Sequence, residues 1–334
     1  MSKKSLRLEW SEFEVNDRLL RSNLLPRRSG HVAWTAADQT VFVFGGYAED
    51  HDSSRYAVND LWKWKDGWSR LDPAGDIPGP RIVSAGALLG DAYFLFGGWD
   101  PQSSGTGGTI LDEVSKVQNN RWKKLPITLP NGPASRHIVV ALDTNTALFH
   151  NHRCTDHVFV FHAENQCFTK VLTSGEAPSS RGLHAACTMG KYVVMFGGAA
   201  QGGTMSDEAF LLDTDIWHWT LIRVGDGPTP RAAPCMCEYS QNCIILFGGA
   251  EATEAGLNPR GDVWALHIDT HSGEGSWELL WDDDKGGNGP QPRNAATLCE
   301  IEREANSKSY LLTGGWVPFR ETWGDNFVLK ITSD

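Results

Sequence analysis

The most regular pattern in the chain is a short, mostly apolar run that ends in two glycines. Five copies are intact: VFVFGG (41–46), YFLFGG (93–98), YVVMFGG (192–198), IILFGG (244–249) and YLLTGG (310–315). A sixth copy, ALFHN (147–151), carries His150 and Asn151 in place of the glycines. Each run has the length of a buried β-strand, and repeats spaced by roughly 50 residues are typical of propellers and solenoids.

Each copy is surrounded by the same three landmarks. A Pro-containing loop and an arginine precede it, an aspartate opens the next apolar run, and an aromatic residue stands in the run after that. The arginines are Arg28, Arg81, Arg136, Arg181, Arg231 and Arg293; the aspartates are Asp60, Asp112, Asp156, Asp207, Asp262 and Asp325; the aromatic residues are Trp68, Trp122, Phe168, Trp219 and Trp277. Each unit therefore reads as four short strands, and no segment shows sustained helical periodicity.

The last unit lacks its fourth strand, because the chain ends at Asp334 soon after the apolar run 327–331. The missing strand is found at the other end of the chain. The alternating segment LRLEWSEFEV (6–15) has Trp10 in the aromatic position. We therefore expect this N-terminal strand to complete the last unit and to close a ring, which removes the open sheet edges.

Units of about 50 residues with a diglycine after the second strand and a tryptophan in the fourth resemble the Kelch repeat. The resemblance covers residues 1–334 and implies an all-β fold, a single six-bladed Kelch-type β-propeller. We expect structural roles for the repeated landmarks. Glycines allow sharp strand ends, aspartates cap turns, and aromatic side chains fill the space between blades.

Composition narrows the classes of partner and compartment. With 30 Lys+Arg and 41 Asp+Glu, the net charge is −11, which disfavours nucleic-acid binding. No apolar run approaches the roughly 18 residues of a membrane helix, and no signal peptide is visible, so we expect no membrane contact. Seven scattered cysteines fit buried free thiols in a reducing compartment. We therefore expect a cytoplasmic protein.

The candidate ligand site lies where the loops before the first strands and after the second strands converge around the axis. The predicted ligand-binding residues are Arg28, His31, Arg81, Trp99, Arg136, Arg181, His184, Arg231, Glu251, Arg293 and Trp316. Guanidinium groups and aromatic walls favour a carboxylate or another acidic ligand. The alternative is that each arginine pairs with a loop carboxylate and braces the blades.

The function that these features favour is a scaffold that binds a protein or an acidic peptide, without cofactor or metal. The chain has no nucleophile elbow, P-loop or dinucleotide fingerprint, and the sequence identifies no catalytic residue.

Three alternatives involve a metal. The first is an enzyme similar to the plant nitrile-specifier and epithiospecifier proteins, which are standalone Kelch propellers that use ferrous iron. Their Glu-x3-Asp-x3-His motif falls in the loop after the fifth diglycine. That loop reads AEATEAGLNPRGD (250–262) here, with Glu251 and Glu254 but no Asp and His at the required spacing. The second is a copper radical oxidase, which needs a Tyr–Cys crosslink. The third is a metal site at His150, His152 and His157, where a divergent structural blade is the other interpretation.

Overall fold

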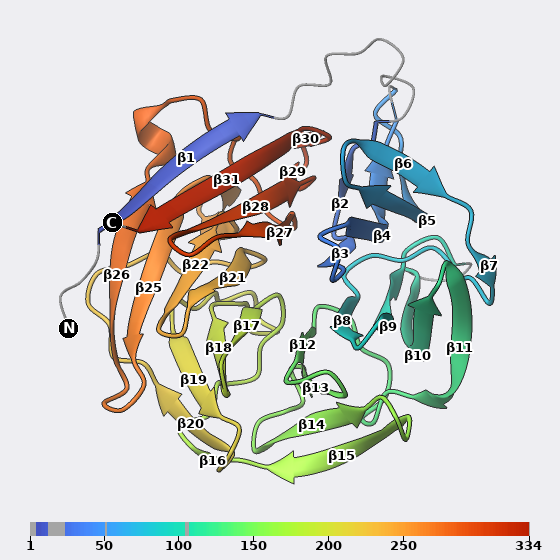
Figure 1. Cartoon of the computed structure of the whole chain (residues 1–334), viewed down its shortest axis with the longest axis horizontal. Helices are drawn as coiled ribbons and strands as arrows, with labels where there is room; N and C mark the ends of the chain where they lie inside the picture. Colours follow the sequence, from blue (N-terminus) through green and yellow to red (C-terminus); the bar gives the residue numbers. More distant parts are fainter. Residues whose placement is uncertain (1–4, 13–23, 51, 104–106, 334) are drawn as a thin grey trace.

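The computed structural model describes residues 5–12, 24–50, 52–103, 107–333. In these residues, antiparallel sheets stand around a central axis as the six blades of a β-propeller (Figure 1). The colours run around the ring in chain order, and the blades are numbered in that order below. The all-β, six-bladed fold inferred from the repeat is therefore confirmed.

Each blade has four main strands. Blade 1 comprises β3 (Val32–Thr35), β4 (Val41–Glu49), β5 (Arg55–Trp64) and β6 (Trp68–Leu71). Blade 2 comprises β8 (Ala85–Leu89), β9 (Ala92–Asp100), β10 (Thr109–Gln118) and β11 (Arg121–Thr128). Blade 3 comprises β12 (Ile138–Ala141), β13 (Thr146–His150), β14 (His157–His162) and β15 (Cys167–Leu172). Blade 4 comprises β17 (Ala185–Met189), β18 (Tyr192–Phe196), β19 (Ala209–Asp213) and β20 (His218–Leu221).

Blade 5 comprises β21 (Cys235–Ser240), β22 (Cys243–Phe247), β25 (Val263–Asp269) and β26 (Glu274–Trp281). Blade 6 comprises β27 (Thr297–Arg303), β28 (Ser307–Thr313), β31 (Asn326–Ser333) and β1 (Leu6–Glu12). Short elements lie in the connections: β2 (Arg28–Ser29), β7 (Ala74–Gly75), β16 (Ser174–Gly175), β23 (Ala250–Thr253), β24 (Gly256–Pro259), β29 (Trp316–Val317), β30 (Glu321–Thr322) and the 3-10 helix η2 (Asp283–Lys285). No helix in the described part of the chain is long and apolar enough to cross a membrane.

The N-terminal strand closes the ring as expected. β1 pairs antiparallel with β31 from Leu6 opposite Ser333 to Glu12 opposite Phe327, and the two strands lie side by side in Figure 1. Trp10 packs edge-on against Phe247 of blade 5, with ring centroids 5.6 Å apart. The first and last parts of the chain are thus joined by a ladder of backbone hydrogen bonds and by a large aromatic contact. Residues 13–15 of the predicted strand lie outside the described residues.

The second strands are buried on both faces because each blade is covered by its two neighbours. All five residues of β22 are buried, which explains why these runs are apolar throughout rather than alternating. Aromatic side chains of the fourth strands fill the space between blades. Trp122 of blade 2, for example, lies 4.7 Å from Phe44 of blade 1 between ring centroids and is almost fully buried.

Candidate functional site

A closed ring of backbone hydrogen bonds surrounds the axis just before the first strands, and we call it the mouth ring. Its members are Gly30, Val83, Arg136, Leu183, Ala233 and Ala295. The N–H of each donates to the carbonyl of the equivalent residue in the preceding blade, at 2.7–3.1 Å. All six have a positive φ between 47° and 61°, which costs free energy for the five that are not glycine. The ring ties every blade to its neighbours and defines the face that we call the mouth face.

Two residues before the mouth ring, five blades carry a buried arginine, and we call these five the brace arginines. Arg231 shows the arrangement: its Nη1 donates to the carbonyl of Gly248 at 3.1 Å and its Nε to the carbonyl of Thr229 at 3.0 Å. Its two terminal nitrogens also bind the carboxylate of Asp262 at 2.6 and 3.0 Å. The equivalent pairs are Arg28–Asp60, Arg81–Glu113, Arg181–Glu208 and Arg293–Asp325. The side chains of the five are 0–3% exposed.

This arrangement corrects the role expected for the acidic landmarks. Asp60, Asp262 and Asp325 neutralise brace arginines instead of capping turns. In two other blades the pairing acid is the residue after the predicted aspartate, Glu113 rather than Asp112 and Glu208 rather than Asp207. Burial by itself would raise the pKa of Asp60, but the hydrogen bond and charge of Arg28 outweigh it and hold that pKa below its ordinary value.

The brace arginines therefore lie at the mouth face but do not present open guanidinium groups to it. Ligand binding by Arg28, Arg81, Arg181, Arg231 and Arg293 stays a prediction, and the geometry is that of the bracing alternative. Arg181 is the least enclosed pair, because the side chain of Glu208 is 46% exposed whereas that of Asp262 is 4% exposed.

The structure places Arg136 differently from the other five predicted arginines. The carbonyl of Arg81, a brace arginine, accepts a hydrogen bond from the N–H of Gly46, the second glycine of the preceding blade. In blade 3 the carbonyl that accepts this bond, from Gly98 N–H, belongs to Ala134, so Ala134 holds the brace position. Arg136 instead belongs to the mouth ring and is exposed. The proline before the brace position could have revealed this, since Pro133-Ala134 aligns with Pro80-Arg81.

Blade 3 also lacks the other partners of the brace. In blade 5, Asp262 stands just before the third-strand residue that pairs with Phe247. The equivalent position in blade 3 is Val158, just before the residue that pairs with Phe149. His150 and Asn151 replace the two glycines, and neither has the positive φ that both glycines have in the other five copies. Ala134 and Val158 are almost fully buried. The arginine, its carboxylate and the diglycine are thus replaced together.

Four buried histidines lie beneath the mouth ring. His31, His137 and His184 each follow a ring residue directly, and His150 Nδ1 lies 3.1 Å from His184 Nε2 across the blade 3–blade 4 boundary. Burial lowers the pKa of His31 and His150 to about 3 and that of His137 to about 4. The pKa of His184 also falls well below its ordinary value, first through burial. These side chains are therefore neutral at pH 7.

The candidate metal residues are not brought together. His152 is exposed, His157 bonds to Asp156, and His150 faces His184. Glu251 accepts a hydrogen bond from Asn258 at 2.8 Å and lies 3.8 Å from Arg260.

Among the described residues, the group with metal-like spacing is Asp282, Asp283 and Asp284. The charge of this group is offset in part by Arg260, which lies 3.4 Å from both Asp283 and Asp284.

Aromatic side chains gather on one half of the mouth face. Tyr47, Trp99 and Trp316 follow the diglycines of blades 1, 2 and 6, where blades 4 and 5 have Ala199 and Ala250. Arg55 lies over the ring of Trp316 at 5.3 Å, and Phe319 meets that ring edge-on at 5.6 Å. We call Tyr47, Trp99, Trp316 and Phe319 the aromatic arc. Phe319 is 85% exposed and has a φ of 60° in a turn closed by Arg320 N–H and the carbonyl of Val317.

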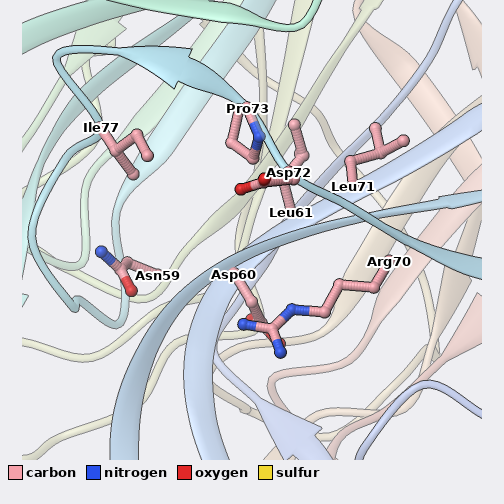
Figure 2. Close-up of a pocket in the computed structure, with 8 residues that line it drawn as sticks. All are labelled: Asn59, Asp60, Leu61, Arg70, Leu71, Asp72, Pro73 and Ile77. Atoms are coloured by element: carbon pink, nitrogen blue, oxygen red, sulfur yellow. The ribbon is translucent and has the colours of Figure 1, made fainter.

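Two pockets lie at the periphery of the mouth ring. One of about 410 Å³ lies between β5 and β6 of blade 1, where the guanidinium of Arg70 points toward Asp60 (Figure 2). Asp60 already pairs with Arg28 and Trp62, so its carboxylate has little hydrogen-bonding capacity left for a ligand. The other, of about 340 Å³, is lined by Arg181, Thr204, Met205 and Glu208 in blade 4.

Comparison with known proteins agrees with the repeat and the fold. Residues 4–198 and 147–334 match the model of the KLHDC2/KLHL20/DRC7 Kelch-repeats domain. Kelch domain-containing protein 2 of Bos taurus is 24% identical over 276 residues, which cover 72% of this chain and 67% of that protein. Tip elongation aberrant protein 1 of Schizosaccharomyces pombe is 24% identical over 77% of this chain and 18% of its own length. The solved structure of YjhT shares the fold, with a TM-score of 0.67, 14% identity and coverage of 93% of this chain and 98% of that one. The chain belongs to the Kelch-repeat family.

Proposed function

We propose that residues 1–334 act as one propeller and that this propeller is a scaffold which binds a protein or peptide segment on its mouth face. Kelch propellers generally mediate protein interactions, and membership of the family supports this proposal. The observation that supports the mouth face as the binding surface is the aromatic arc.

The aromatic arc has the features of a binding surface. The conformation of Phe319 carries two free-energy costs: its ring is exposed to water, and its backbone adopts a left-handed region that glycine prefers. Trp316 beside it is only partly buried and lies under a cation. Tryptophan, tyrosine and arginine dominate the binding energy of protein interfaces. The arc therefore offers an anchor for a partner, while the small Ala199 and Ala250 of blades 4 and 5 leave room for its backbone.

The test is to select peptides from a random phage-displayed library against the immobilised full chain and to measure their affinities by calorimetry. We expect Trp316→Ala and Phe319→Gly each to weaken the selected peptides about tenfold or more, because truncation of an interface anchor costs about 2 kcal/mol. Ile216→Ala is the matched control. Ile216 is 67% exposed in the turn between β19 and β20, at the far end of the blade from the mouth, and we expect less than a twofold change.

Two outcomes would overturn the proposal. One is a set of selected peptides that bind both arc variants as tightly as the unaltered chain. The other is a library that yields no binder at all. Thermal melts of each variant separate loss of binding from loss of folding, and Phe319→Gly should melt no lower than the unaltered protein because glycine suits the positive φ.

A further inference from the structure

Arg136 and Arg153 of blade 3 differ from the brace arginines in having no acidic partner among the described residues. Arg136 is exposed on the mouth ring and forms no ion pair with any described residue. Arg153 is also exposed, and its Nη1 donates to the carbonyls of Asn131 and Pro133 at 2.9 and 3.0 Å. These carbonyls belong to the loop that leads to Arg136. Arg153 is therefore bound to the loop that carries Arg136, and two hydrogen bonds orient its guanidinium group.

The loops after the second strands of the other five blades all carry acids, and three of them also carry an arginine, Arg55, Arg260 or Arg320. Glu49 and Asp50 follow the diglycine of blade 1, Asp100 that of blade 2, Asp207 and Glu208 that of blade 4, Glu251 that of blade 5, and Glu321 and Asp325 that of blade 6. The corresponding turn of blade 3, residues 151–155, reads NHRCT and carries no acid. Asp156, which follows it, is hydrogen-bonded to His157. Blade 3 is thus the blade whose turn after the second strand carries a cation, Arg153, and no acid.

The brace arginines cannot take this role without breaking their own pairs. Each is buried and already bound to a carboxylate, so a ligand would have to displace an internal partner. The histidines beneath Arg136 carry no charge at pH 7, so they neither pair with it nor add to it. A carboxylate that reaches the mouth of a protein with a net charge of −11 therefore meets, at blade 3, two exposed guanidinium groups that have no acidic partner among the described residues.

We propose that the segment bound on the mouth face is rich in glutamate or aspartate and that Arg136 and Arg153 anchor its carboxylates. This inference rests on the proposed function and names the chemistry of the partner. Arginine binds carboxylates through paired N–H donors, which lysine cannot reproduce, so the contact is specific as well as electrostatic. Arg136 and Arg153 would hold the acidic part of the segment while the aromatic arc receives its apolar part.

The experiment measures binding of fluorescein-labelled hexaglutamate to the full chain by fluorescence polarisation. We expect Arg136→Glu and Arg153→Glu each to weaken binding at least tenfold, and Arg136→Lys to recover only part of the affinity. Lys123→Glu is the matched control: it makes the same charge change on the exposed outer strand β11, and we expect a change of less than twofold. Thermal melts of every variant verify that it is folded.

Three results would overturn the inference: no binding of hexaglutamate by the unaltered chain, an equal loss in Lys123→Glu, or tighter binding of a dT6 oligonucleotide than of hexaglutamate through the same arginines. The two proposals fail in different ways. If library peptides respond to Trp316→Ala but not to Arg136→Glu, the mouth face binds peptides and the acidic chemistry is wrong. If hexaglutamate responds to Arg136→Glu while the arc variants change nothing, the aromatic contribution is wrong.

Discussion

Blade 5 and blade 3 build the same four-stranded meander with different devices at the mouth. In blade 5, Arg231 is buried between Asp262 and the carbonyl of Gly248, and both glycines of the pair have a positive φ. In blade 3, Ala134 and Val158 hold the positions of the arginine and the acid. The comparison shows that the diglycine, the arginine and the carboxylate behave as one unit that is kept or replaced whole.

A physical reason explains why the replacement is concerted. A buried ion pair gains little over two apolar residues, because the attraction between the charges is offset by the cost of removing both from water. Removing one partner alone leaves a buried charge without compensation, which is strongly destabilising. In blade 3 both partners of the ion pair are replaced by apolar residues, and the cations at its mouth are exposed instead of buried. Removal of one partner alone can be tested by mutation in blade 5.

The largest effect is expected when blade 5 loses one half of its brace. Arg231→Ala should lower the free energy of unfolding by about 3–5 kcal/mol, because Asp262 would remain buried and unpaired. Urea denaturation followed by tryptophan fluorescence measures this. Arg121→Ala, on the exposed outer strand of blade 2, is the control and should change stability by less than about 0.5 kcal/mol.

The double variant Arg231→Ala/Asp262→Val copies blade 3 and tests whether the unit is lost as a whole. It should be more stable than Arg231→Ala alone, although it contains one substitution more, because no unpaired charge remains. A double variant that is less stable than the single one would contradict the explanation given for blade 3.

The second prediction uses the buried histidines, of which His150 and His184 meet across the blade 3–blade 4 boundary. Their pKa values in the folded protein are depressed by burial, to about 4 for His137 and about 3 for His150, whereas unfolded histidine titrates near 6.5. The unfolded chain therefore binds more protons below pH 6.5. Stability is complete above that pH and falls as the pH decreases toward the folded values, by about 1.4 kcal/mol per pH unit for each histidine.

His137→Ser places at this position the residue that blade 2 has, Ser84, and removes one of the titrating groups. Urea midpoints measured between pH 7 and pH 4.5 should fall less steeply in this variant than in the unaltered protein. His271→Ser, which alters an exposed turn, should leave the slope unchanged. Parallel pH dependences for His137→Ser and the unaltered chain would show that His137 is not kept neutral by burial.

The sequence revealed the fold because the repeat is dictated by backbone geometry. At Gly46, with a φ of 100°, an added Cβ would lie 2.8 Å from the Cβ of His31, so glycine recurs wherever a second strand ends at the mouth. The closing strand was recognisable for a similar reason, since Trp10 supplies the aromatic residue that blade 6 lacks.

The state of the arginines could not be read in the same way. Whether Arg231 faces a ligand or a carboxylate depends on Asp262, which lies 31 residues further along the chain and meets it only once the third strand is in place. The exposure of Arg136 depends on a shift of two positions within the loop of blade 3. The burial and pairing of the arginines therefore depend on the assembled blade, whereas the repeat pattern depends only on the local sequence of each strand.

The smallest effect is expected at the one brace that is open to solvent. Glu208 pairs with Arg181 at 2.7 Å but is 46% exposed, and the hydrogen bond from Arg181 holds its pKa below the ordinary value. Because an exposed ion pair contributes up to about 1 kcal/mol, Glu208→Gln should cost no more than that. Asp262→Asn, at a carboxylate that is 4% exposed, should lower the free energy of unfolding several times as much, because the buried Arg231 is shielded from solvent and would lose its charged partner. Urea denaturation at low salt and in 1 M NaCl separates the two, because screening should remove most of the Glu208 effect and little of the Asp262 effect. Equal costs at the two sites would mean that exposure of the carboxylate does not govern the strength of the brace.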